Sequence, residues 1–86
     1  MLAHVSADSL SLVLARALRA ERARAGLSQS ELAARLGTSQ TRVAALESGA
    51  RKLYAAELPG VCSALGVTLA DLLYKADPDD RRALGL

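Results

Sequence analysis

The stretch SQSELAARLGTSQTRVAALESG contains two short helical patterns that are separated by a glycine and a threonine. Ser28 and Glu31 match the S-x-x-E capping box, in which each side chain accepts a hydrogen bond from the other residue's backbone N–H. Gly37 ends this first helix, and either Thr38 or Ser39 caps the second, which runs to the final glycine. Two helices joined by so short a turn cross at a steep angle, and the rest of the chain must fold around that crossing.

Such a crossing needs particular residue types, and the sequence supplies them. Ala33 is small, so the second helix can pack closely over the first. Gly37 lacks a Cβ, so the turn can adopt a positive φ at little cost. The apolar positions of the two helices fall on one shared face, which we expect to be buried: Leu32, Leu36, Val43 and Leu46.

Another helical pattern precedes this stretch. A helix is predicted from about Ser9 or Ser11 to Ala25, because leucines recur there at intervals of four residues. Asp8 or Ser9 can cap its start, and Gly26 is expected to end it in the left-handed conformation.

On the C-terminal side, a helix is predicted over about residues 55–65. Its regular part is expected to begin near Glu57, because the proline that follows is tolerated only in the first helical turn. Thr68 and Asp71 form a second capping box, and Asp77 with the next proline can start a short extra helix. The sequence therefore predicts an all-α fold of five helices, with a short sixth at the C-terminus as a further option.

Composition excludes several classes of protein. A chain of 86 residues that lacks Phe and Trp and is rich in Ala, Leu and Arg is expected to form one small helical domain. Cys62 is the only cysteine, so no internal disulfide can form and a reducing, cytoplasmic location is expected. We expect no signal peptide, no membrane span and no cofactor. His4 has no second ligand residue near it, so no metal site is predicted. The sequence offers no pair of a nucleophile and a base, so we do not expect an enzyme.

Charge is spread unevenly along the chain. Residues 1–52 hold eight Lys and Arg against four Asp and Glu, a net charge of +4. Residues 53–86 hold three against five, a net charge of −2. A basic N-terminal part is compatible with binding a polyanion through one side of the molecule.

The helix pair and its flanks together resemble a known family. The stretches RAGLSQSELAARLGTSQTRVAALESG and ALGVTLADLL, within Leu14 to Leu73, resemble the XRE family of lambda-like Cro and repressor proteins. The resemblance implies a five-helix, lambda-repressor-like DNA-binding domain with a helix-turn-helix over residues 9–74. It leaves residues 75–86 as a C-terminal tail that is a candidate dimerisation element.

The resemblance also implies that the helix after the turn lies in the major groove of DNA. Its expected base-reading residues are Gln40, Thr41, Arg42 and Ala45. A glutamine amide can form a bidentate pair with adenine, a threonine methyl can contact thymine, and an arginine can reach guanine or a phosphate. Ala44 and Ala45 are too short for more than methyl contacts, which departs from family members with long polar residues there.

Four further positions are expected to bind phosphate: Gln29, Ser39, Arg51 and Lys52. Gln29 resembles a family glutamine that contacts phosphate and supports the first base-reading residue. Arg51 and Lys52 follow the recognition helix, where the alternative is an ordinary polar loop. Arg22 and Glu47 match a family ion pair, expected here to be partly buried and to fix the angle of the recognition helix.

Three functions remain open at this level. The first is a sequence-specific transcriptional regulator, a homodimeric repressor that binds double-stranded DNA at a pseudo-palindromic operator. The second is an antitoxin or a restriction-modification controller protein with a protein partner such as a toxin. The third is a helical protein-interaction module that does not bind DNA. The basic N-terminal part favours the first two functions over the third.

A homodimer is expected to use the C-terminal part. That part has more apolar residues than one short helix needs: Val67, Leu69, Leu72, Leu73 and Tyr74. Leu84 and Leu86 add apolar side chains in the tail. The alternative is that these leucines complete the core of the monomer, and residues Met1 to Val5 are a rival contact surface.

Overall fold

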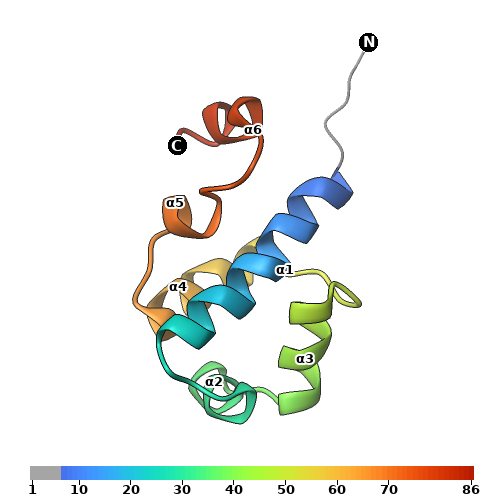
Figure 1. Cartoon of the computed structure of the whole chain (residues 1–86), viewed down its shortest axis with the longest axis vertical. Coiled ribbons are helices and arrows are strands. Elements are labelled where there is room, and N and C mark those ends of the chain that lie inside the picture. Colours follow the sequence, from blue (N-terminus) through green and yellow to red (C-terminus); the bar gives the residue numbers. More distant parts are fainter. Residues whose placement is uncertain (1–6) are drawn as a thin grey trace.

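The computed structural model describes residues 7–86 of the chain, which contain helices and no strand (Figure 1). The all-α prediction is therefore confirmed, and the short C-terminal helix is present. The elements are α1 (Ala7–Arg24), α2 (Gln29–Leu36), α3 (Gln40–Ser48), the 3₁₀ helix η1 (Ala55–Glu57), α4 (Leu58–Leu65), α5 (Leu69–Leu72) and α6 (Pro78–Ala83). His4 and the rival contact surface at Met1 to Val5 lie outside the described residues.

The start of α1 differs from the prediction. The helix already includes Ala7, so Asp8 and Ser9 lie inside it and neither is its N-cap. Residues of capping type do not by themselves fix a helix boundary when a helix can extend through them. The C-terminal end is as predicted, since Gly26 has φ of 74° and its backbone N–H donates to the Ala23 carbonyl over 3.0 Å.

The turn between α2 and α3 follows the capping pattern of the sequence. Ser28 Oγ accepts from the Glu31 backbone N–H at 3.0 Å, and Glu31 Oε1 accepts from the Ser28 N–H at 2.8 Å. Gly37 ends α2 with φ of 68°, a conformation that costs a residue with a Cβ far more than glycine. Ser39, and not Thr38, caps α3 by accepting from the Arg42 N–H at 3.1 Å.

One hydrophobic core joins the first five α-helices. Its most buried members are Leu18 of α1, Leu32 and Ala33 of α2, Val43 and Leu46 of α3, Val61 and Leu65 of α4, and Leu72 of α5. Both helices of the steep crossing contribute to it, so their angle is set by shared packing as well as by the turn. Arg35 adds a polar link by donating from Nη1 to the Ala64 carbonyl at 3.0 Å, which ties α2 to α4.

The C-terminal part is built from short helices. The Thr68–Asp71 capping box is present, and Asp77 accepts from the Asp79 N–H at 2.8 Å at the start of α6. Leu72 and Leu73 are almost fully buried, so these two leucines complete the monomer core and do not form an outer surface. Figure 1 shows α6 at the end of the molecule opposite α2.

Candidate nucleic-acid interface

The helix α3 has two distinct faces. Val43 and Leu46 point into the core, whereas Gln40 and Thr41 in its first turn are exposed. The alanines that continue this outer face, Ala44 and Ala45, are half-buried. The outer face thus offers long polar side chains at the start of α3 and only methyl groups further along.

A partly buried ion pair connects this helix to α1. Arg22 Nε donates to Glu47 Oε2 at 2.6 Å and Arg22 Nη2 donates to Glu47 Oε1 at 3.0 Å, so the pair is bidentate. The side chain of Glu47 is only 3% exposed and that of Arg22 is 16% exposed. A third nitrogen, Nη1, donates to the Leu27 carbonyl at 2.7 Å. The guanidinium therefore joins the C-terminal turn of α3 to the loop that precedes α2.

The carboxylate of Glu47 stays charged despite its burial. Burial acts to raise the pKa of Glu47, but hydrogen bonds from Arg22 and Gln29, with the positive charges of Arg22 and Arg19, lower that pKa below its usual value. The hydrogen bond to Glu47 in turn raises the pKa of Arg22. An uncompensated charge at this depth would be costly, so the two residues depend on each other.

The ion pair continues as a relay to the outer face of α3. Gln29, the first residue of α2, donates from Nε2 to Glu47 Oε1 at 3.1 Å. Gln40, the first residue of α3, donates from Nε2 to Gln29 Oε1 at 2.7 Å. One set of hydrogen bonds thus runs from the half-buried Arg22 to the exposed Gln40, across three helices.

Arg42 is not brought together with Gln40. Its guanidinium forms an ion pair with Glu57, with Nη1 at 2.9 Å and Nη2 at 2.8 Å from Oε2, and both side chains are half-buried. Glu57 Oε1 also accepts from the Tyr54 N–H at 2.8 Å. This pair holds α3 against η1, so a base-reading role for Arg42 requires the pair to open and stays a prediction.

The predicted phosphate ligands lie around α3. The Oγ of Ser39 already caps the helix, and Gln29 is half-buried beside Gln40. Arg51 and Lys52 are exposed, and both line a shallow hollow of about 290 Å³ behind the C-terminal end of α3. Ser39 and Gln29 thus lie at the N-terminal end of α3, and Arg51 and Lys52 follow its C-terminal end.

Sequence reasoning missed one basic residue near this face. Arg19 is exposed on α1 and lies close enough to Glu47 for its positive charge to lower the pKa of that carboxyl. The spacing of Arg19 and Arg22 could have indicated this, because residues three positions apart on a helix lie on the same face. Arg19 is therefore an additional candidate for phosphate contact.

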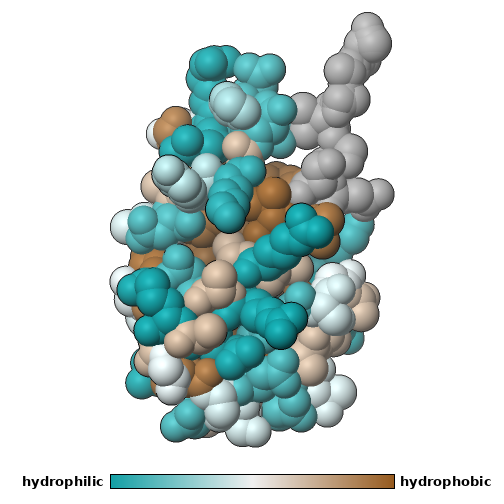
Figure 2. Space-filling model, viewed as in Figure 1, coloured by the Kyte–Doolittle hydropathy of each residue, from teal (hydrophilic) through white to brown (hydrophobic). Residues whose placement is uncertain are grey.

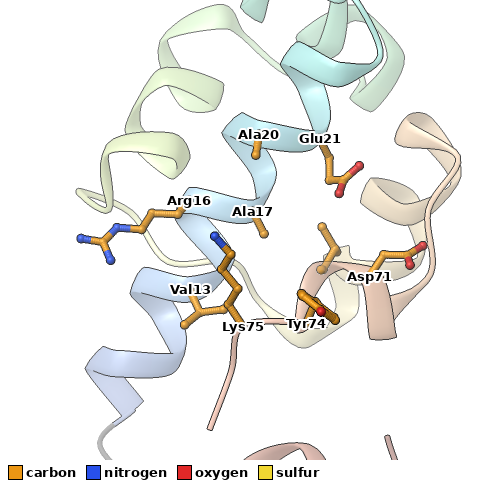
Figure 3. Close-up of a pocket in the computed structure, with 9 residues that line it drawn as sticks. Val13, Arg16, Ala17, Ala20, Glu21, Asp71, Tyr74 and Lys75 are labelled. Atoms are coloured by element: carbon orange, nitrogen blue, oxygen red, sulfur yellow. The ribbon is translucent and has the colours of Figure 1, made fainter.

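A second surface lies away from α3, in a groove between α1 and α5. Figure 3 shows Val13 and Ala17 on its floor, with Tyr74 against the α5 side. The groove has a volume of about 670 Å³ and carries charges of both signs on its rim. Figure 2 shows apolar surface near the N-terminal half of α1, with smaller apolar patches elsewhere on the same side of the molecule.

Other kinds of site are not found in the part of the chain that the structure describes. Residues 7–86 contain no group of three or more His, Cys, Asp or Glu that could hold a metal ion. None of their helices is both long enough and apolar enough to cross a bilayer. Burial, and to a smaller degree Asp71, raises the pKa of the Cys62 thiol, which makes it a poor nucleophile.

Solved structures of other proteins share the fold of this chain. The clp gene regulator ClgR from Corynebacterium glutamicum matches in two crystal structures. One is 37% identical, covers 78% of this chain and 86% of that chain, and has a TM-score of 0.73. The other is 36% identical over 88% and 79% of the two chains, also with a TM-score of 0.73. The hypothetical transcription factor NHTF from Neisseria is 32% identical over 98% and 95%, with a TM-score of 0.71.

The comparison with protein families agrees with the fold. A search of curated proteins gives no match. The helix-turn-helix family model matches residues 18–72, which include α2, α3 and most of the core. The match covers more than half of the chain and contains the crossing, the glycine turn and the relay. The chain therefore belongs to the XRE-type helix-turn-helix family of DNA-binding proteins.

Proposed function

We propose that this protein is a sequence-specific, homodimeric transcriptional repressor that reads the major groove with α3. The observation that carries the proposal is the relay from Arg22 through Glu47 and Gln29 to Gln40. A helix that served only the core would need no ordered amide chain leading to its exposed first turn. The relay holds a base-reading side chain in place before DNA arrives, which reduces the ordering cost of binding.

Base and phosphate contacts divide between the two helices. Gln40 and Thr41 face the base edges, where an amide pairs with adenine and a threonine contacts the thymine methyl. The free N–H groups and positive dipole end of α2, with Gln29, face a phosphate. Arg51, Lys52 and the newly identified Arg19 supply charge on either side, which positions α3 without reading sequence.

The partner in the dimer is a second copy of this chain, bound at the groove between α1 and α5. Its lining residues include Arg16, Lys75, Glu21 and Asp71. In Figure 3 the two acids lie on the same side, the Lys75 amine lies nearer Arg16, and the Arg16 side chain extends outward. A two-fold axis places the basic side of one copy opposite the acidic side of the other, so the surface is self-complementary. Tyr74, which is 72% exposed, supplies the apolar contact.

The same axis accounts for recognition of a pseudo-palindromic operator. One recognition helix covers only a few base pairs, and two helices read successive major grooves when they lie about 34–36 Å apart. A dimer that covers such a site at a promoter excludes other proteins from the same DNA. Repression is therefore the outcome that we propose.

Binding-site selection from random DNA, followed by titration at several salt concentrations, tests the proposal. We expect a pseudo-palindromic consensus and an affinity that falls about 10³–10⁵-fold between 50 and 200 mM salt, if six to ten phosphates are contacted. Lys52→Ala should weaken binding to all sequences alike and reduce the salt dependence. Arg82→Ala, which removes an exposed charge on α6, is the matched control and should change neither. A selection without enrichment, together with a nearly flat salt dependence, would contradict the proposal.

A further inference from the structure

Glu47 is placed where it can control base recognition without touching DNA. Its carboxylate is buried in the last turns of α3, yet it is hydrogen-bonded to the amide of Gln29, which holds Gln40 in the first turn. The Arg22 pair alone would explain a buried carboxylate. The additional hydrogen bond to Gln29 gives Glu47 a connection to the DNA-facing side chain.

The chemistry of a carboxylate fixes the direction of this relay. An ionised carboxylate only accepts hydrogen bonds, so Gln29 must direct its NH₂ group toward Glu47. The carbonyl oxygen of Gln29 then points toward Gln40, and Gln40 must donate one of its N–H groups to it. Each amide has one orientation because the relay ends at the Glu47 carboxylate, which can accept hydrogen bonds but has no proton to donate.

This direction determines what Gln40 has left for a base. One N–H of its amide is used by Gln29, so one N–H and the carbonyl oxygen remain. Adenine presents an N6 donor and an N7 acceptor in the major groove, which match that remaining pair. Guanine presents two acceptors, O6 and N7, and would need the complete NH₂ group. Only a reversed relay, with Gln40 accepting from Gln29, would free that group.

We propose that Glu47 is a specificity-determining positioning residue, which makes Gln40 select adenine over guanine by fixing the direction of the amide relay. This inference rests on the proposed DNA-binding function and names the control of that same site. It predicts that specificity changes when the acceptor-only character of residue 47 is removed, even when the shape of the side chain is kept.

Glu47→Gln is the decisive variant. Glutamine can keep its carbonyl oxygen for Arg22 Nε at the position of Oε2 and place its NH₂ group at the position of Oε1, where it donates to Gln29 and reverses the relay. The hydrogen bond from Arg22 Nη2 to that position is then lost. The measurement is the ratio of dissociation constants for two operators that differ only at the base pair assigned to Gln40. That base pair is the one at which Gln40→Ala loses discrimination. Wild type should prefer A·T over G·C roughly 5- to 150-fold, as expected for one bidentate contact. In Glu47→Gln the ratio should fall to near one or invert.

Two further variants separate positioning from stability. Val61→Ala removes buried apolar volume from α4 and leaves the ion pair and the relay in place, so it should lower the melting temperature and keep the adenine preference. Gln29→Met keeps the bulk of the side chain and breaks the relay, so it should reduce the preference even if Glu47→Gln fails to fold. The ratio of two dissociation constants does not depend on the fraction of active protein, so partial unfolding cannot imitate the effect.

The outcomes are distinguishable. If wild type shows no sequence preference, the proposed function fails and the inference fails with it. If Gln40→Ala loses the preference while Glu47→Gln and Gln29→Met retain the wild-type ratio, the inference alone is wrong. Loss of the preference in Val61→Ala to the same extent as in Glu47→Gln would also overturn it, because general loosening would then explain both.

Discussion

The α2–α3 region and the α5–α6 region are both made of short capped helices, but they are held in different ways. In the first, side chains bond across elements, as from Arg22 to Glu47 and from Arg42 to Glu57. In the second, the side-chain hydrogen bonds join residues two or three positions apart, as in Thr68 with Asp71. The first region is therefore fixed in its orientation, while the second keeps accessible apolar side chains such as Tyr74 and Leu84.

The largest expected effect breaks the fixed region. Arg22→Ala removes the ion-pair partner of the buried Glu47 carboxylate, which keeps only the hydrogen bond from Gln29 and the more distant charge of Arg19, so the free energy of unfolding should fall by up to about 3–5 kcal/mol. Denaturant unfolding followed by circular dichroism measures the loss. Arg82→Ala removes an arginine from a pair whose side chains are 77% and 78% exposed, and should leave the stability nearly unchanged. Equal stability of wild type and Arg22→Ala would show that the pair contributes nothing.

A smaller effect tests the accessible region. Tyr74→Ala should change the stability of the monomer by no more than about 0.5 kcal/mol, because the side chain is exposed. The same change should shift the sedimentation of the full chain, at micromolar concentration, from dimer toward monomer. A chain ending at Lys75 keeps the residues that line the groove and removes the rest of the tail, so it separates the two surfaces. If that chain is still a dimer, the tail is not the interface, and a wild-type monomer would refute the dimer itself.

The smallest effect is the pH dependence of stability in the α2–α3 region. The pKa of Glu47 is lowered in the folded state, so its contribution to stability is present above its unfolded value of 4.5 and is lost as pH falls through the folded value. Glu31 and Asp71 have lowered pKa values as well, owing mainly to hydrogen bonds within their capping boxes. Wild type should therefore lose stability below about pH 4.5, and Glu47→Gln should lose less over the same range, as melting curves from pH 7 to 3 can show. Identical slopes for the two proteins would contradict this assignment.

What could be predicted from the sequence was mainly local. The Ser28–Glu31 and Thr68–Asp71 capping boxes depend on residues three positions apart, so their spacing alone indicates them. The glycine that ends α2 is similarly evident, because few other residues tolerate positive φ. The Arg22–Glu47 pair was expected only through resemblance to a family, since 25 positions separate its members.

Contacts between distant segments could not be predicted. Nothing in the sequence connects Arg42 to Glu57, or Arg35 to the carbonyl of Ala64, because those contacts exist only once α3 and α4 are packed. The same reason explains why two leucines of the C-terminal part are not available to a dimer surface, since packing in the monomer buries Leu72 and Leu73. The dimer surface itself stays a prediction. The start of α1 was misjudged because capping residues occurred where the helix simply continues.

The short alanines on the outer face of α3 have a consequence for how such a protein finds its sites. With Ala44 and Ala45 half-buried, the proposed complex would read sequence mainly through the first turn of α3, so each half-site would specify few base pairs. A genome offers about 10⁶–10⁹ competing sites, many of which contain one such half-site by chance. Selectivity must then come from requiring two half-sites at a fixed separation. In the proposed dimer, the rigidity of the contact between subunits, more than the chemistry of α3, would determine how few sites in a chromosome are bound.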